Sequence, residues 1–129
     1  MINFLGIVPA REGSKGIKNK HLIKINKIRV IDYTFKNFTN SKLLKNLIIS
    51  TDDKKLIKYA KKYNVIIPFL RPKKISGDDT PMEDVIIHLF DWCKKNYYLP
   101  KNFILLQPTS IFREIKDINN AIKKYLKQK

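Results

Sequence analysis

The sequence predicts a single α/β domain, 1–129, built on a doubly wound, mostly parallel sheet. Short apolar runs occur at 2–9, 47–50, 65–70 and 103–106, and each is followed by a segment with helical periodicity. Strands that are apolar throughout are typical of parallel sheets covered on both faces, and right-handed crossovers between them produce the doubly wound arrangement. With 129 residues, 43% of them hydrophobic, the chain is long enough for one core.

The N-terminal half is expected to contain two strands and two helices. The first strand ends at Pro9 and leads into a loop rich in Gly and cations. From Val30 to Asn40 apolar residues recur at helical spacing, which predicts a helix. The run 47–50 precedes Thr51-Asp52-Asp53, which supply a capping residue and acids for the first turn of the next helix.

The C-terminal half is expected to contain two more strand–helix pairs. After the run 65–70, Thr80-Pro81-Met82-Glu83 has the pattern of a capping box with Pro at the first helical position. The helix should extend to about Asn96, with His88 facing solvent among charged neighbours. Its buried side is expected to comprise Val85, Ile86, Leu89, Phe90 and Cys93. A last helix from about Asp117 is expected to bury Ile118, Ile122 and Tyr125.

The net charge of +16 does not by itself indicate a nucleic-acid-binding protein. The lysines are spread over the whole sequence, and in 53–63 they lie opposite an apolar stripe of Leu56, Ala60 and Tyr63, as on a solvated helix face. No platform of aromatic residues accompanies them, as single-stranded nucleic acids would require. We therefore expect no nucleic-acid partner.

The sequence also predicts a cytoplasmic protein without a membrane partner. Its apolar runs are much shorter than a bilayer span. Met1 leads directly into the first predicted strand, with no pattern of a secretory signal peptide. Cys93 is the single cysteine, which excludes an internal disulfide framework.

The polar loops that follow the strands indicate where a ligand binds. Ligands of doubly wound sheets bind beyond the carboxyl ends of the strands, which brings the loop 10–22, the Asp52 region, the Arg71 region and Gln107 to one rim. Glycines and cations in the first of these loops suit the phosphates of a nucleotide. The residues concerned are Arg11, Gly13, Ser14, Lys15, Gly16, Lys18 and Lys20.

Other familiar patterns are missing from this rim. The first loop has neither the P-loop spacing nor G-x-G-x-x-G, and no Ser–His–Asp arrangement or metal-spaced Cys/His cluster occurs. Gln107 can both donate and accept hydrogen bonds to a base edge or a ribose. Thr80 is explained as a helix cap, although the helix it opens could also bind an anion at its N-terminus. The rim is thus suited to positioning and neutralising phosphates.

These segments, taken together, resemble the N-terminal half of the CMP-N-acylneuraminate synthetases, the acylneuraminate cytidylyltransferases. The resemblance covers almost the whole chain, and the combination of its segments is specific. The segments are IVPAREGSKGIKNKHL, NLIISTDD, VIIPFLRP, GDDTPMEDVIIH and ILLQPTS. It implies a nucleotide-diphospho-sugar transferase, or Rossmann-like, fold. It also implies transfer of CMP from CTP to an acidic nine-carbon sugar with release of pyrophosphate, for cell-surface glycan synthesis such as lipopolysaccharide or capsule.

The resemblance also assigns roles to residues. Arg11 and Lys20 would be catalytic, with Lys20 stabilising the transition state against the phosphates. Nucleotide binding would involve Arg11, Gly13, Ser14, Lys15, Gly16, Lys20, His21, Thr80 and Gln107. Arg71 and Gln107 would contact the substrate. Mg²⁺ is implied as the cofactor, and its aspartate ligands would lie beyond this chain.

The sequence departs from the family pattern in ways that leave alternatives open. His21 stands where the family usually has Asn, and Pro81-Met82 replace a pair of serines, so another nucleotide or another keto-sugar acid remains open. Family members continue well past residue 129, which predicts a chain truncated at its C-terminus or a non-catalytic nucleotide-binding remnant. A sheet that ends after its fourth strand would expose an edge, which predicts a homodimer or other self-association.

Overall fold

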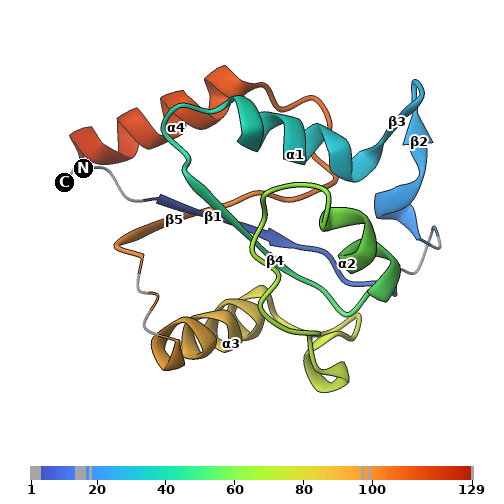
Figure 1. Ribbon diagram of the computed structural model, residues 1–129. Helices are drawn as coiled ribbons and strands as arrows, with labels where there is room; N and C mark the ends of the chain where they lie inside the picture. Colours follow the sequence, from blue (N-terminus) through green and yellow to red (C-terminus); the bar gives the residue numbers. More distant parts are fainter. Residues whose placement is uncertain (1–3, 14–16, 18, 97, 99, 129) are drawn as a thin grey trace.

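The computed structural model describes residues 4–13, 17, 19–96, 98 and 100–128. Three parallel strands form its main sheet in the order β4-β1-β5, with β1 hydrogen-bonded to both neighbours (Figure 1). The elements in chain order are β1 (Phe4–Pro9), a 3-10 turn (Lys20–Leu22), β2 (Lys24–Ile25), β3 (Ile28–Arg29), α1 (Val30–Asn40), β4 (Asn46–Ser50), α2 (Lys54–Ala60), a second 3-10 turn (Lys73–Ile75), α3 (Met82–Lys95), β5 (Asn102–Leu105) and α4 (Ile115–Lys127).

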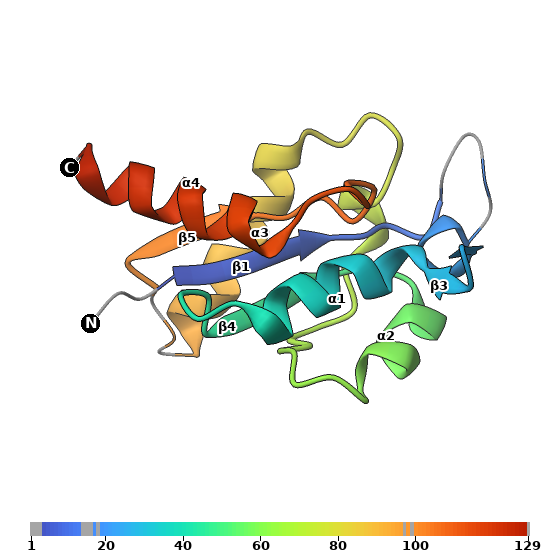
Figure 2. The ribbon, with the colours of Figure 1, turned by 90° about the horizontal axis from the view of Figure 1, so that it is seen from above.

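Helices cover the two faces of this sheet and bury a separate apolar cluster on each. Phe4 and Val8 of β1 point into the cluster under α1, α2 and α4, whereas Leu5 and Ile7 point into the one under α3. This alternation is the two-residue period of a strand buried on both faces. Figure 1 shows α1 and α4 on one side of the strands and α3 on the other, and Figure 2 shows the same layers from above. The predicted doubly wound α/β fold is confirmed.

The position of β1 in the middle of the sheet fixes where loops can meet. The chain leaves β1, crosses over one face through α1 to β4, and later returns through α3 on the other face to β5. The crossovers diverge at the carboxyl end of β1, which leaves a crevice between the loops that follow β1 and β5. None of the helices in the described ranges is long and apolar enough to cross a membrane.

The predicted third strand, 65–70, is wrong. Only Ile66 pairs with the sheet, in a single bridge to Ile48, through hydrogen bonds from Ile66 N to Leu47 O (2.7 Å) and from Ile49 N to Ile66 O (3.0 Å). Pro68 has no N–H with which to extend this pairing. The segment runs alongside β4 as extended chain and then turns away at Arg71.

Sequence reasoning missed the small hairpin formed by β2 and β3. Its turn residues, Asn26 and Lys27, both have left-handed backbones, with φ of 51° and 66°. Such a two-residue turn normally contains Asn-Gly, so a lysine at the second position hides the pattern. The hairpin is tied to the start of α1 by Val30 N, which donates to Ile23 O over 2.9 Å.

Two predicted helix starts need correction. The capping residue of α2 is Asp53, whose Oδ1 accepts from Lys55 N (2.9 Å) and Leu56 N (3.3 Å), while Thr51 donates its hydroxyl to Ala10 O. The capping box at Thr80 is absent, because α3 begins at Met82 after Pro81 and the Thr80 hydroxyl accepts instead from Gly77 N. Pro81 supplies an extended backbone before the helix but no side-chain cap.

Four burial predictions also change. His88 does not face solvent freely, because its ring packs edge-to-face on Phe69 with centroids 4.4 Å apart. Ile86 and Phe90 are half-buried rather than buried. Tyr125 is 46% exposed and makes an edge contact with Phe4 of the sheet. Val85, Leu89, Cys93, Ile118 and Ile122 are buried as predicted.

Candidate functional site

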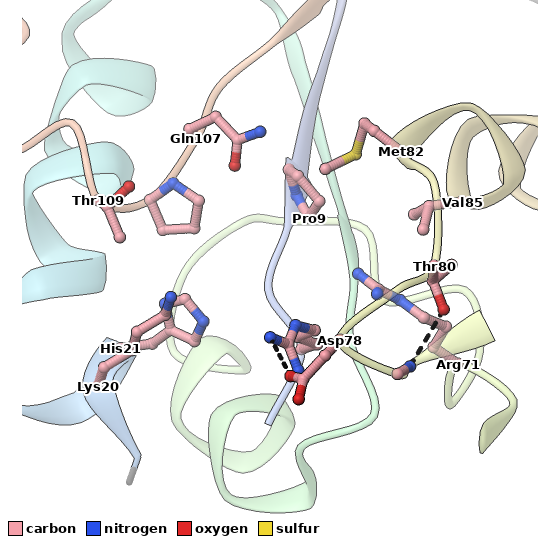
Figure 3. A pocket seen from close by; sticks show the side chains of 13 residues that line it. Pro9, Lys20, His21, Arg71, Asp78, Thr80, Met82, Val85, Gln107 and Thr109 are labelled. Atoms are coloured by element: carbon pink, nitrogen blue, oxygen red, sulfur yellow. Dashed lines mark hydrogen bonds and ion pairs between the residues drawn. The ribbon is translucent and has the colours of Figure 1, made fainter. Parts of the chain in front are cut away.

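A cavity of about 150 Å³ lies at the carboxyl ends of β1 and β5, in the crevice that the crossovers create (Figure 3). Its walls come from four separate stretches of the chain: the end of β1 and its loop, the 3-10 turn after that loop, the segment before α3, and the loop after β5. The lining residues are Pro9, Arg11, Lys20, His21, Arg71, Gly77, Asp78, Thr80, Met82, Val85, Gln107, Pro108 and Thr109. The predicted rim is therefore a concave site.

Six of the sequence-predicted residues line this cavity together. They are Arg11, Lys20, His21, Arg71, Thr80 and Gln107. Gly13 lies in the same loop but is not part of the lining, and its backbone is not left-handed. Asn19, which precedes the 3-10 turn carrying Lys20 and His21, has a left-handed backbone with φ of 54°. Ser14, Lys15, Gly16 and Lys18 lie outside the described residues, so their predicted phosphate contacts stay predictions.

Arg11 reaches across the cavity and meets a carboxylate on the opposite wall. Its Nη2 lies 2.6 Å from Oδ1 of Asp78, a residue of the segment before α3 (Figure 3). Both side chains are partly exposed, at 28% and 39%. The base of this loop is anchored independently, because Glu12 N donates to Oδ1 of Asp52 over 2.7 Å.

Arg71 has a different environment on the same cavity. Its backbone N donates to Thr51 O (2.7 Å), its Nε to the Ser50 hydroxyl (3.1 Å) and its Nη2 to Ser50 O (2.8 Å). The side chain is buried, and this burial lowers the pKa of the guanidinium below its ordinary value. The geometry shows Arg71 fastening the extended segment to the end of β4. Its predicted contact with substrate is a separate, untested role.

Lys20 and His21 form the wall made by the first 3-10 turn. His21 is only 4% exposed, and its Nδ1 is buried without a hydrogen-bond partner among the described residues. Burial lowers the pKa of His21, and the adjacent charge of Lys20 lowers it further. Both effects favour the neutral form of the imidazole. Because no carboxylate of the described residues lies within ion-pair distance of Lys20, its ammonium is available to a ligand.

The remaining polar wall comes from Gln107 and Thr80. The side-chain amide of Gln107 extends toward the cavity from the end of β5 (Figure 3). Its backbone carbonyl accepts from Arg113, which also reaches the Thr34 hydroxyl over 3.5 Å. Arg113 thus braces the loop that presents Gln107. The hydroxyl oxygen of Thr80 accepts a hydrogen bond from Gly77 N, so Thr80 shapes the cavity wall formed by the segment before α3.

Sequence reasoning missed several lining residues. Asp78 carried no pattern that distinguished it from its neighbour Asp79, and only the fold shows that its carboxylate faces Arg11. Met82 and Val85 form an apolar part of the wall because the first turn of α3 passes beside the crevice. Pro9 could have been found from its position as the last residue of β1.

The described residues contain no evident site for a divalent metal. No group of three His, Cys, Asp or Glu side chains among them could hold an ion. Oδ1 of Asp52 accepts from Glu12 N, Asp53 caps α2, and Asp78 pairs with Arg11. Each of these carboxylates has at least one oxygen engaged within the protein, and the described residues do not gather enough ligands to fit Mg²⁺ by themselves.

A crevice at the switch point of a doubly wound sheet, with two reachable cations and polar groups, is the place where α/β proteins of this class bind their ligands. The chain matches the family model described as cytidylyltransferase over residues 5–129, and it belongs to that family.

Two curated relatives illustrate the similarity. The chain is 41% identical over 80 residues to the CMP-N,N'-diacetyllegionaminic acid synthase of Campylobacter jejuni serotype O:2, a match covering 62% of this chain and 34% of the relative. It is 31% identical over 121 residues to the N-acylneuraminate cytidylyltransferase of Escherichia coli O18:K1:H7, covering 94% and 28%. The chain spans between about a sixth and about a half of the length of the curated relatives it matches. The predicted family is confirmed.

Among solved structures, the chain is similar to CMP:2-keto-3-deoxy-manno-octonic acid synthetase complexed with CTP. The TM-score is 0.73 and the sequence identity 16%, and the match covers 95% of this chain and 46% of the other. At this identity the similarity concerns the fold, and it agrees with the sheet and helices described above.

Proposed function

We propose that this protein takes part in transferring CMP from CTP to an acidic sugar of the nine-carbon type, with release of pyrophosphate. The observation that carries the proposal is a cavity at the carboxyl ends of β1 and β5, in a chain of the cytidylyltransferase family, lined by the cations Arg11 and Lys20 and by the side chains of His21 and Gln107. The relatives are named for legionaminic acid and for N-acylneuraminate. They support an acidic sugar as the acceptor.

In the proposed reaction, a hydroxyl oxygen of the sugar attacks the α-phosphorus of CTP. The new oxygen–phosphorus bond forms as the bond to the β-phosphate oxygen breaks, and the hydroxyl proton passes to solvent. Arg11 and Lys20 neutralise charge on the phosphates, most of all on the departing pyrophosphate. Lys20 suits this work because no carboxylate of the described residues pairs with it.

The base and ribose would be held by the neutral walls. Gln107 can donate and accept together, which matches the alternating donor and acceptor edge of cytosine. The neutral imidazole of His21 has a buried Nδ1 without a partner in the described structure, and a hydroxyl or amino group of the nucleoside could satisfy it. Mg²⁺ belongs to the proposal through the family alone, and no step above is assigned to it.

A thermal-shift panel with CTP, UTP, ATP, GTP and dTTP, each with and without Mg²⁺, tests the nucleotide part. A ligand present at 100 times its Kd stabilises the fold by about 2.7 kcal/mol. We expect the largest rise in melting temperature with CTP. Equal rises with all five nucleotides, or none with any, would contradict the proposal.

The sugar part is tested by pyrophosphate release from CTP with legionaminic, pseudaminic and N-acetylneuraminic acids as acceptors. Lys20→Ala is expected to abolish release in this assay. Lys24→Ala, in which an exposed lysine outside the cavity is removed, serves as the matched control. Release that depends on CTP but on none of these acids would redirect the acceptor to another class.

A further inference from the structure

One of the two accessible cations of the cavity, Arg11, is already paired with a carboxylate of the protein, that of Asp78. Arg11 and Asp78 are 67 positions apart in sequence, yet their Nη2 and Oδ1 atoms approach to 2.6 Å. The other ion pair in the described chain, between Lys116 and Glu114, is exposed at the start of α4 and is not part of the cavity. Among the described residues, the Arg11–Asp78 pair is therefore the ion pair that lines the cavity.

A ligand whose phosphates reach the described cations of the cavity meets this pair. Arg71 has its Nε and Nη2 engaged by Ser50 and lies buried, so it has little to offer an incoming anion. Of the described cavity cations, Lys20 and Arg11 remain. A di- or triphosphate that uses both must take the Arg11 guanidinium from Asp78.

The segment that carries Asp78 is held by contacts that do not involve its carboxylate. Gly77 N donates to the Thr80 hydroxyl (3.1 Å), Thr80 N to Gly77 O (3.3 Å) and the Ser76 hydroxyl to Pro72 O (2.8 Å). The carboxylate can therefore rotate away from Arg11 while the segment keeps its shape. Since it is 39% exposed, water can solvate it after release.

We propose that Asp78 is an internal competitor for the phosphates of the ligand: its carboxylate occupies the Arg11 guanidinium until a phosphate displaces it. The exchange replaces one charge-assisted contact of Arg11 by another, so it costs each ligand that uses Arg11 the same fraction of its affinity. The role in turnover rests on the proposed function. After the reaction, the returning carboxylate competes with pyrophosphate for Arg11 and shortens the time that this product stays bound.

Calorimetric titrations of inorganic pyrophosphate, CTP and cytidine into the unmodified protein, Asp78→Asn and Asp79→Asn test the proposal at fixed ionic strength. Asp79 is the matched control, because it is an exposed neighbour of equal charge without an ion pair to Arg11. Loss of an exposed pair of this kind should tighten pyrophosphate and CTP binding in Asp78→Asn by about threefold to fivefold. We expect Asp79→Asn to change both affinities by less than about twofold, and cytidine to bind all three proteins alike.

The double variant Arg11→Ala/Asp78→Asn closes the thermodynamic cycle. If Asp78 acts through Arg11, its replacement has no effect on pyrophosphate affinity once Arg11 is absent. Equal tightening by Asp78→Asn and Asp79→Asn would overturn the proposal in favour of a general charge effect. Weaker binding to Asp78→Asn would overturn it in favour of a supporting role. Pyrophosphate binding without CTP selectivity would contradict the proposed function while leaving this test intact.

Discussion

Two arginines, Arg11 and Arg71, line the same cavity, and their surroundings suit them to different roles. Arg71 is buried and hydrogen-bonded to Ser50 at the end of β4. Arg11 is partly exposed and touches a carboxylate that can swing away. A buried guanidinium whose donors are spent on the backbone holds the fold together, whereas an accessible one in an exchangeable pair can serve a ligand. Identity and position at the rim are thus not enough to assign a role.

The largest expected effect is on stability, and it separates the two arginines. Arg71→Ala removes the donor to the buried Ser50 hydroxyl and one of the two donors that the described residues supply to the Ser50 carbonyl oxygen, which keeps Ala10 N, and this should lower the free energy of unfolding by about 2–4 kcal/mol. Arg11→Ala should lower it by less than about 1 kcal/mol. Urea unfolding followed by fluorescence of Trp92 measures both. Similar losses in the two variants would show that the comparison is wrong.

The second largest expected effect is on pyrophosphate affinity, for which Arg11 should matter more than Arg71. Arg11→Ala should weaken pyrophosphate binding more than about tenfold, because a charge-assisted contact to phosphate is lost. Arg71→Lys keeps the charge but not the planar fork, and it should disturb stability more than phosphate affinity. Titration calorimetry at a temperature where both variants are folded gives the affinities. A larger loss of affinity in Arg71→Lys would make Arg71 the main phosphate ligand.

The third prediction concerns pH and the buried wall beside Arg11. Burial lowers the pKa values of both His21 and His88 below the ordinary value of 6.5. As the pH falls below 6.5, the histidines of the unfolded chain take up protons before those of the folded chain. The contribution of these histidines to the free energy of unfolding is therefore complete above this pH and declines below it. The chain contains only these two histidines. Urea unfolding at pH 7.5 and 5.5 should show the decline, and His88→Gln should reduce it.

The smallest effect is expected on the outer face of α2. Lys58, in α2, and Lys61, just after it, are exposed and do not line the cavity. Replacing both by Gln should change stability by less than about 0.5 kcal/mol and leave CTP affinity unchanged at physiological salt. The same double variant compared in a duplex-binding assay checks that the positive charge is solvated surface. Tight, salt-sensitive duplex binding by the unmodified protein would contradict that reading.

Local sequence patterns predicted the structure correctly where the residues that determine it lie within one short segment. Val30–Asn40 has a clear helical period and becomes α1 with the predicted bounds. Pro9 and Gln107 close apolar runs, and the rule for carboxyl ends of parallel strands placed their loops together. Thr80, by contrast, matched a capping pattern whose geometry did not form, because Gly77 N competes for its hydroxyl.

The sequence by itself determined the fold class, the family and the edge of the sheet that carries the site, because apolar periodicity and loop chemistry are properties of contiguous residues. Only the tertiary structure decided which arginine has its donors engaged within the fold and which one is accessible to a ligand. The partners that decide it come from distant segments: Ser50 for Arg71 and Asp78 for Arg11. A residue's chemistry is set by its neighbours in space, and for these two arginines the chain supplies those neighbours only after it has folded.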